Sequence, residues 1–124
     1  MSPTKRIAFI GNSLPRRCGI ATFTTDLQQA IACSDVDTSI VAMNDHGNGY
    51  DYPFSVHCQI SDQRLEDYAR AADFLNEGRF DVVSLQHEFG IFSGEAGSHI
   101  MALLSRLTMP VVTTLHTVLA EPNA

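Results

Sequence analysis

The sequence predicts an α/β fold in which a parallel sheet is covered by helices on both faces. Short apolar segments of strand length alternate along the chain with longer segments whose apolar residues recur at helical spacing. Three of the strand-like segments run directly into polar, loop-like clusters. Strands that alternate with helices are joined by right-handed crossovers and form a parallel sheet, so we expect a doubly wound sheet of about five strands in the order 3-2-1-4-5.

The N-terminal third predicts a buried central strand and the first helix. Residues 7–10 form a continuous apolar run that Gly11 ends, which is typical of a strand buried on both faces. Residues 19–33 have apolar side chains at helical spacing, and the three threonines of this segment are expected to be tolerated only in its first turns. The predicted buried stripe of this helix consists of Ile20, Phe23, Leu27, Ala30 and Ile31.

The middle of the chain predicts two more strands and a second helix. Residues 38–43 are β-branched and apolar, and a stretch of turn-forming residues ends this second strand. Residues 54–60 alternate, with Phe54 on the apolar face, as expected of a half-buried edge strand. The second helix is predicted to begin after a cap at 61–63 and to end at Gly78.

The C-terminal third predicts a fourth strand, a third helix and a fifth strand. The strand covers residues 80–86, and the helix covers residues 95–107 with Ser93 as its N-cap. Pro110 opens the fifth strand, which runs into His116. Because the printed chain ends soon afterwards, we expect one Rossmann-like domain that has been truncated before a sixth strand and a last helix.

Composition and charge narrow the class of protein. The formal net charge of -6 and the pI near 5.1 disfavour a nucleic-acid surface, because phosphate binding needs a basic field. The three cysteines form no CxxC pair and follow no secretory signal, so we expect a reducing, cytoplasmic location. No apolar run approaches the ~20 residues of a membrane span. The five histidines show no metal-ligand spacing, so no metal is expected.

Polar clusters follow three of the predicted strands. The carboxyl ends of parallel strands meet at one edge of a sheet, and ligands of open α/β folds bind in the crevice outside that edge. We therefore expect the residues around 12–19, 87–90 and 116 to line one shared cleft.

The first cluster, residues 11–19, has features of an anion site. Gly19 would let a ligand approach the backbone, the helix that follows offers unpaired N–H groups, and Arg16 and Arg17 add positive charge. The glycine spacing is neither GxGxxG nor that of a P-loop, which disfavours the usual dinucleotide and Mg-nucleotide sites. The alternative is a plain strand-to-helix turn with solvated arginines. Cys18 could be a reactive thiol, but no base partner is evident.

The second and third clusters supply groups that bind hydroxyls and move protons. His87 and Glu88 directly follow the fourth strand, where an imidazole and a carboxylate could hydrogen-bond sugar hydroxyls or exchange a proton. The motif is not HExxH, because Ile91 stands four residues after His87, and zinc-protease chemistry is therefore excluded. A salt-bridged or capping role for one of the pair, and a structural role for His116, are the alternatives.

Three segments of the chain resemble the N-terminal domain of glycosyltransferase family 4, whose members are glycogen-synthase-like. They are residues 15–23 (PRRCGIATF), residues 86–92 (QHEFGIF) and residues 110–116 (PVVTTLH). The resemblance covers nearly the whole chain, and the second segment is the most specific, being typical of a bacterial and archaeal subgroup. It implies a GT-B architecture, in which two Rossmann-like domains face a cleft.

The resemblance implies transfer of a sugar from a nucleotide-sugar donor to a sugar or other hydroxyl acceptor. Transfer retains the anomeric configuration and needs no bound metal or other cofactor. The N-terminal domain holds the acceptor, and the C-terminal domain holds most of the donor. In members of this type the first loop approaches the donor diphosphate and the acceptor, and that loop corresponds here to Arg16, Arg17, Cys18, Gly19 and Ile20.

The resemblance also names candidates for contacts with the sugars. A histidine near the cleft touches the transferred sugar in this family, and His87 or His116 matches it here. The catalytic candidates are His87, Glu88 and His116. The residues assigned to acceptor binding are Asn12, Phe89 and Gly90.

The expected partners follow from the same resemblance. They are a nucleotide-sugar, a carbohydrate acceptor and the missing donor-binding domain, without which this chain alone should not catalyse turnover. A peripheral membrane contact of the full enzyme stays open, and so does a homodimer through the surface that the missing domain would cover.

A function of a different class is the alternative to the glycosyltransferase. This alternative is a stand-alone flavodoxin-like module that binds a small molecule or has a regulatory role. A receiver-type signalling domain is disfavoured, because Asn12 and Ser13 occupy the place of the acidic residues that it needs after the first strand.

Overall fold

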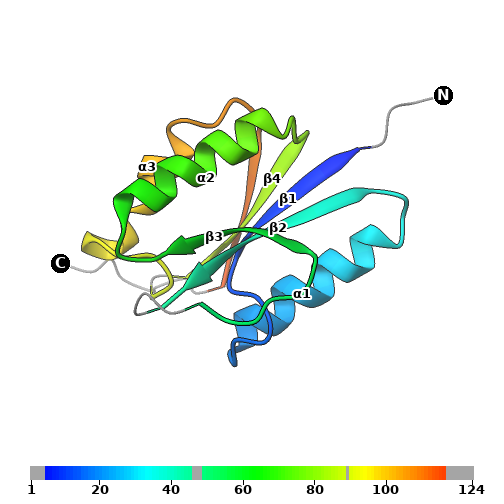
Figure 1. The fold of residues 1–124 in the computed structure, drawn as a ribbon, viewed down its shortest axis with the longest axis horizontal. Helices are drawn as coiled ribbons and strands as arrows, with labels where there is room; N and C mark the ends of the chain where they lie inside the picture. Colours follow the sequence, from blue (N-terminus) through cyan, green and yellow to red (C-terminus); the bar gives the residue numbers. More distant parts are fainter. Residues whose placement is uncertain (1–4, 46–48, 89, 117–124) are drawn as a thin grey trace.

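The computed structural model describes residues 5–45, 49–88 and 90–116, which form a five-stranded sheet with helices on both faces (Figure 1). All of its strand pairs are parallel, and the strand order is β3-β2-β1-β4-β5. The elements are β1 (Arg6–Gly11), α1 (Gly19–Ala32), β2 (Asp37–Asn44), β3 (Val56–Ser61), α2 (Leu65–Glu77), β4 (Val82–His87), η1 (Glu95–Gly97), α3 (Ile100–Leu104) and β5 (Val111–Leu115). The predicted fold class and the order 3-2-1-4-5 are confirmed.

The central strand β1 positions the other strands. It pairs with β2 on one side, from Arg6 opposite Asp37, and with β4 on the other side, from Ile7 opposite Val82. Its last residues are completely buried because neighbouring strands and helices cover both faces, as predicted for a continuous apolar run.

Two hydrophobic clusters lie on opposite faces of the sheet, because successive strand residues point in opposite directions. Ala8 and Ile10 of β1 belong to the larger cluster, which packs against α2 and α3. Phe9 belongs to the smaller cluster, which packs against Leu27 and Ile31 of α1. Figure 1 shows α2 and α3 on one side of the sheet and α1 on the other.

Helix α1 has the predicted bounds to within one residue, but its predicted buried stripe is only partly right: Ile20, Leu27 and Ile31 pack against the core clusters while half-buried. The buried residues are Ala21, Thr24, Thr25 and Gln28, whereas the predicted Phe23 is 44% exposed and Ala30 is also exposed. The helix approaches β1 closely, since a Cβ on Gly11 would lie only 3.1 Å from Thr24 Oγ1. Small side chains fit this space, and large ones are displaced to the rim of the contact.

Hydrogen bonds satisfy the polar side chains on this face of α1. The Thr24 hydroxyl donates to the carbonyl of Ile20 at 2.8 Å, as threonines in helices often do. Thr25 Oγ1 accepts from the backbone N–H of Leu14 at 3.2 Å, and the loop after β1 is thereby joined to the helix. The polar face of α1 therefore carries no unpaired threonine hydroxyl, which lowers the cost of burying it.

Strand β3 is the predicted edge strand but is shorter than predicted. Phe54 is 98% exposed and lies before the strand, which begins at Val56 after a turn in which the Val56 N–H donates to Pro53 O at 3.1 Å. The pairing of β3 with β2 also shifts register between Ile40 and Val41. These irregularities remove Phe54 from the alternating pattern.

Helix α2 ends as predicted and begins differently. Gly78 occupies its C-cap, but Arg64 is the N-cap residue and makes no side-chain cap hydrogen bond, so the predicted cap at 61–63 is wrong. Instead, Asp67 Oδ2 in the first turn accepts from the backbone N–H of Ser61 at 2.9 Å.

The predicted third helix is interrupted. Residues 95–107 form the short 3-10 helix η1 and the five-residue helix α3, because Gly94, Ala96 and Gly97 adopt positive φ angles of 90°, 53° and 76°. Ser93 is not the N-cap of either helix; its carbonyl accepts from the His99 N–H at 2.9 Å. Left-handed backbone conformations end a right-handed helix, and the apolar spacing alone did not reveal them.

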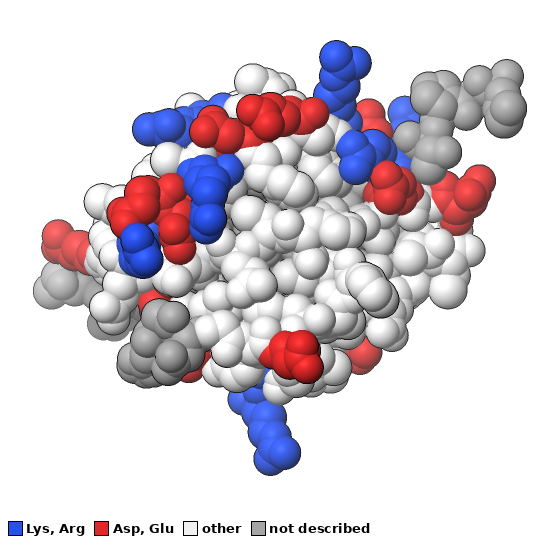
Figure 2. All heavy atoms as spheres, viewed as in Figure 1, with Lys and Arg blue, Asp and Glu red and all other residues white. Residues whose placement is uncertain are grey.

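Charged side chains of both signs are interleaved along α2, at the upper left of the face shown in Figure 2. Ion pairs there join Arg64 to Glu66 at 3.0 Å and Arg70 to Asp67 at 3.3 Å.

In the part of the chain that the structure describes, no helix has both the length and the apolar character needed to cross a membrane.

Candidate functional site

The carboxyl ends of β1, β4 and β5 meet at one rim of the sheet. A cavity of about 480 Å³ lies at this rim, and we call it the rim cavity. The residues that line it are Asn12, Arg16, Cys18, Gly19, Ile20, Glu88, Gly90, Ile91 and His116. All three predicted polar clusters contribute to this wall, so the structure brings them together as the parallel topology requires.

His116 lies at the end of β5 with its ring held from two sides. Its Nε2 lies 2.9 Å from Oε1 of Gln86, which is completely buried in β4. Phe23 of α1 contacts the ring edge-on, with the ring centroids 4.8 Å apart and the planes at 83°. The exposed Phe23 therefore has a definite contact, although not with the core where the helical spacing predicted it.

His87 is the backbone neighbour of His116 but is not among the described residues that line the rim cavity. The His116 N–H donates to the His87 carbonyl at 2.9 Å, which continues the pairing of β4 with β5 beyond the strand end. The His87 ring packs instead against Phe92 of the larger core cluster, with ring centroids 6.0 Å apart. Successive side chains of β4 point to opposite faces of the sheet. Gln86 therefore reaches His116, and His87, the next residue, points to the other face, where Phe92 lies.

Arg16 lines the rim cavity, but its guanidinium already has partners inside the protein. Its Nη1 donates to Asn12 Oδ1 at 3.0 Å and to the Met43 carbonyl at 3.1 Å. Its Nη2 lies 3.9 Å from Asp45 Oδ2. The positive charge expected at this loop is therefore largely balanced, and Arg16 holds the loop against the end of β2.

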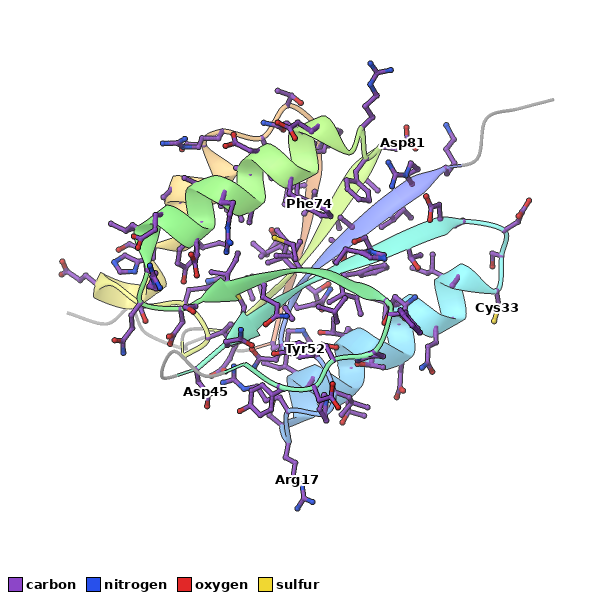
Figure 3. The ribbon with its side chains drawn as sticks, viewed as in Figure 1. Arg17, Cys33, Asp45, Tyr52, Phe74 and Asp81 are labelled. Atoms are coloured by element: carbon purple, nitrogen blue, oxygen red, sulfur yellow. The ribbon has the colours of Figure 1, made fainter. Side chains whose placement is uncertain are left out.

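Arg17 is exposed and extends away from the molecule in Figure 3. It is not among the described residues at the rim cavity. The two neighbouring arginines, for which the sequence predicts the same role, are thus in different environments. Arg16 is held in a hydrogen-bond network, and Arg17 is solvated.

Two tyrosines support the Arg16 network from the segment after β2. The Tyr50 hydroxyl donates to Asp45 Oδ1 at 2.7 Å, and this hydrogen bond raises the pKa of Tyr50. The Tyr52 hydroxyl donates to Asn44 Oδ1, and burial raises the pKa of Tyr52 to about 12. In Figure 3, Asp45 is labelled near the end of β2, and Tyr52 is labelled closer to α1. Both phenols stay neutral donors near pH 7.

Cys18 is the N-cap of α1. Its Sγ accepts from the backbone N–H of Ala21 at 3.3 Å and from Asn12 Nδ2 at 3.3 Å. Two hydrogen-bond donors therefore point at the sulfur, and the side chain joins the end of β1 to the start of α1. Asn12 is 3% exposed and links this cap to Arg16.

Gly19 leaves the start of α1 open. A Cβ built there would meet no atom within 4 Å, so packing within the described chain does not require glycine at this position. The space beside it belongs to the rim cavity, where a ligand could approach the backbone of the first helical turn.

The loop after β4 supplies the opposite wall. Glu88, Gly90 and Ile91 line the rim cavity, and a turn closes with the Ile91 N–H donating to the Glu88 carbonyl at 3.1 Å. A Cβ on Gly90 would lie 3.8 Å from Glu88 Oε1, so Gly90 lies directly against this carboxylate. Phe89, predicted to contact the acceptor, lies outside the described residues.

Sequence reasoning missed Gln86 and Ile91 as parts of the site. Ile91 is almost buried and has no polar atom, so only its position in the wall identifies it. Gln86 did have a signal, because it is a polar residue at the end of an otherwise apolar strand segment. Such a residue must find hydrogen-bond partners when it is buried.

The rim cavity combines an imidazole, a carboxylate, a thiol and an amide around an open helix start. These groups can donate to and accept from hydroxyl groups, and the imidazole and carboxylate can also move a proton. Within residues 5–45, 49–88 and 90–116, no group of three or more His, Cys, Asp or Glu side chains could hold a metal ion.

Comparison with known proteins identifies no relative of this chain. The chain gives no significant match to protein-family models, to curated proteins or to solved structures. What is shown for this chain is therefore its fold, a Rossmann-like α/β fold with a five-stranded parallel sheet ordered 3-2-1-4-5.

Proposed function

We propose that this chain is the acceptor-side half of a retaining glycosyltransferase of GT-B architecture. The observation that carries the proposal is the rim cavity, in which residues after three separate strands surround one space of ligand size. The segments that resemble glycosyltransferase family 4 each contribute to that space, through Cys18 and Gly19, through Glu88 and Gly90, and through His116.

The charges at the rim cavity favour a neutral, hydroxyl-rich ligand. Arg16 is the lining cation, and it is close to Asp45 and shares the wall with Glu88. The lining residues therefore include one carboxylate and one guanidinium that is already engaged within the protein, so they offer little free positive charge to an anionic acceptor. A sugar acceptor needs no such charge, because hydroxyl groups can pair with carboxylate, imidazole and amide alike.

In this proposal Glu88 and His116 contact the sugars, and the open start of α1 at Gly19 faces the donor diphosphate. Most of the charge that stabilises the leaving diphosphate would come from a second, donor-binding domain. His87 keeps its place as a candidate for the transferred sugar, with Phe92 behind its ring. The nucleotide-sugar is a co-substrate, and no cofactor or metal is invoked.

The strand order bears on the alternative of a flavodoxin-like module. Flavodoxin-like sheets have the order 2-1-3-4-5, whereas Rossmann-type sheets begin 3-2-1-4-5, as this one does. A stand-alone binding module would therefore be of Rossmann type and would hold its small molecule in the same rim cavity.

Sugar transfer by the chain joined to its donor-binding domain tests the proposal. Glu88→Gln and His116→Ala should each lower kcat/KM about 10²- to 10⁴-fold, because each removes a group that moves a proton or binds a hydroxyl in the transition state. Asp73→Asn, on the exposed side of α2, is the matched control and should leave kcat/KM unchanged. Full activity in both site variants would refute the proposal, as would failure to transfer sugar from any of the common nucleotide-sugars.

A further inference from the structure

A buried glutamine of β4 contacts His116, one of the residues that line the rim cavity. The Gln86 side chain is 0% exposed, and burying an unpaired amide is costly, so its partners must be specific. It has two described ones: Nε2 donates to Ser84 Oγ at 2.9 Å, and Oε1 lies 2.9 Å from His116 Nε2. One amide thus joins β4 to the cavity-lining histidine of β5.

The fold leaves this side chain little freedom. A Cβ on Gly11 of β1 would lie 3.0 Å from Gln86 Cβ and 3.3 Å from Gln86 Cγ, so the glycine makes room for the stem of the glutamine. The same Cβ would lie 3.1 Å from Thr24 Oγ1, which places α1 against the same space. Such close packing selects one rotamer and points the amide along the sheet toward His116.

We infer that Gln86 is a positioning residue that fixes the ring orientation and tautomer of His116. In the structure the amide Nε2 is placed against Ser84 Oγ and Oε1 against the imidazole, and in this arrangement the amide oxygen can only accept. His116 Nε2 therefore carries the proton, and the neutral ring keeps its acceptor lone pair on Nδ1. Phe23 contacts the ring edge-on, and the hydrogen bond from the His116 backbone N–H to the His87 carbonyl fixes the main chain that carries it.

The consequence is a histidine prepared as an acceptor at the wall of the rim cavity. A base whose proton is held by a third group is oriented before its ligand arrives, which is how catalytic bases are commonly arranged. That the ligand is a sugar hydroxyl rests on the proposed function, whereas the positioning of His116 does not.

Nuclear magnetic resonance of the chain labelled with ¹⁵N-histidine tests the inference without any activity. The His116 ring proton should be on Nε2 in the wild type. In Gln86→Met, which keeps the length and loses the acceptor, this N–H should exchange with solvent about tenfold faster. Gln86→Glu keeps an acceptor and should retain the protected proton, and Gln29→Met, an exposed glutamine of α1, is the matched control.

Three outcomes separate the possibilities. A wild-type ring proton on Nδ1 would overturn the inference, and this measurement needs no variant to fold. Unchanged exchange in Gln86→Met with an intact amide spectrum would overturn it as well. If the ring proton behaves as expected but the two-domain enzyme transfers no sugar from any of the common nucleotide-sugars, the positioning stands and the proposed function fails.

Discussion

Cys18 caps the first helix with a sulfur atom where hydroxyl and carboxylate side chains are usual. Its two donors, the Ala21 N–H and the Asn12 amide, both come from the rim-cavity region. The same side chain therefore orders the loop after β1 and leaves its sulfur in the cavity wall. A residue that looks like a candidate nucleophile in the sequence has a clear structural role in the fold.

Replacing this cap should measurably weaken the protein. Cys18→Ala removes the acceptor for two N–H groups and should lower the free energy of unfolding by about 1 kcal/mol. Cys18→Ser keeps a capping atom and should remain within ~0.5 kcal/mol of the wild type. Urea unfolding of the three proteins at pH 7 provides the comparison, and equal stabilities for the alanine and serine variants would contradict the capping role.

Helix α1 packs on the sheet through small and polar residues, and the contact depends on Gly11. Thr24, Thr25 and Gln28 face inward and are satisfied by local hydrogen bonds, such as that from Gln28 Nε2 to Thr38 Oγ1 at 2.7 Å. Apolar periodicity predicts the element and the packing of Leu27 and Ile31, but it misses the small and polar residues that are buried most deeply, because it scores hydrophobicity and not the space available. The position of the rim cavity depends on this close approach of helix and strand.

Substitutions at two glycines test whether the space around each is as tight or as open as the structure shows. Gly11 lies in a tight contact between β1 and α1, and Gly19 borders open space. Gly11→Ala should destabilise the protein by about 1–3 kcal/mol, since its Cβ would press on Gln86 and Thr24. Gly19→Ala should be neutral or stabilising by about 0.4–1 kcal/mol, because its Cβ enters open space and alanine restricts the unfolded chain. Thermal and urea unfolding measure both, and a Gly11→Ala variant as stable as Gly19→Ala would refute the tight packing of α1.

At the scale of the whole molecule, the two faces of the sheet are covered unequally. The cluster under α2 and α3 is much larger than the cluster under α1. The last strand, β5, is an edge strand whose Val112 and Leu115 are each 59% exposed. Most of the described core therefore lies on the α2 side, with Tyr68 as its largest completely buried side chain.

The buried Tyr68 predicts how stability changes at alkaline pH. Burial raises its pKa to about 12, and its hydroxyl donates to the Asp62 carbonyl at 2.8 Å. A folded pKa above the unfolded value of about 10 contributes stability that is complete below pH 10 and is lost as the pH rises toward 12. The stability advantage of the wild type over Tyr68→Phe should therefore shrink between pH 10 and 12.

Urea unfolding of the two proteins at pH 8, 10 and 11 measures this difference. Comparison with Tyr68→Phe cancels the titration of the other groups, including Tyr52, whose pKa is also raised. A difference that stays constant over this pH range would show that the Tyr68 phenol ionises equally in both states.

The sequence by itself determined the fold class, the strand order and the rim where the polar clusters meet. Strand and helix periodicity are local signals, and the right-handed crossover rule converts their order along the chain into a sheet. The predicted convergence of residues around 12–19, 87–90 and 116 follows from parallel strands ending at one edge, and members of all three groups line the rim cavity.

Only the tertiary structure decided which side chains enter the rim cavity. Arg16 and His116 line the cavity, whereas Arg17 and His87 are not among its described lining residues. The tertiary structure also buries the polar face of α1 and interrupts the predicted third helix at residues with positive φ. It also pairs Gln86 with His116, thirty residues apart. These features depend on packing between segments that are distant in the chain. The spacing of apolar residues within one segment does not show how much room a distant segment leaves for its side chains.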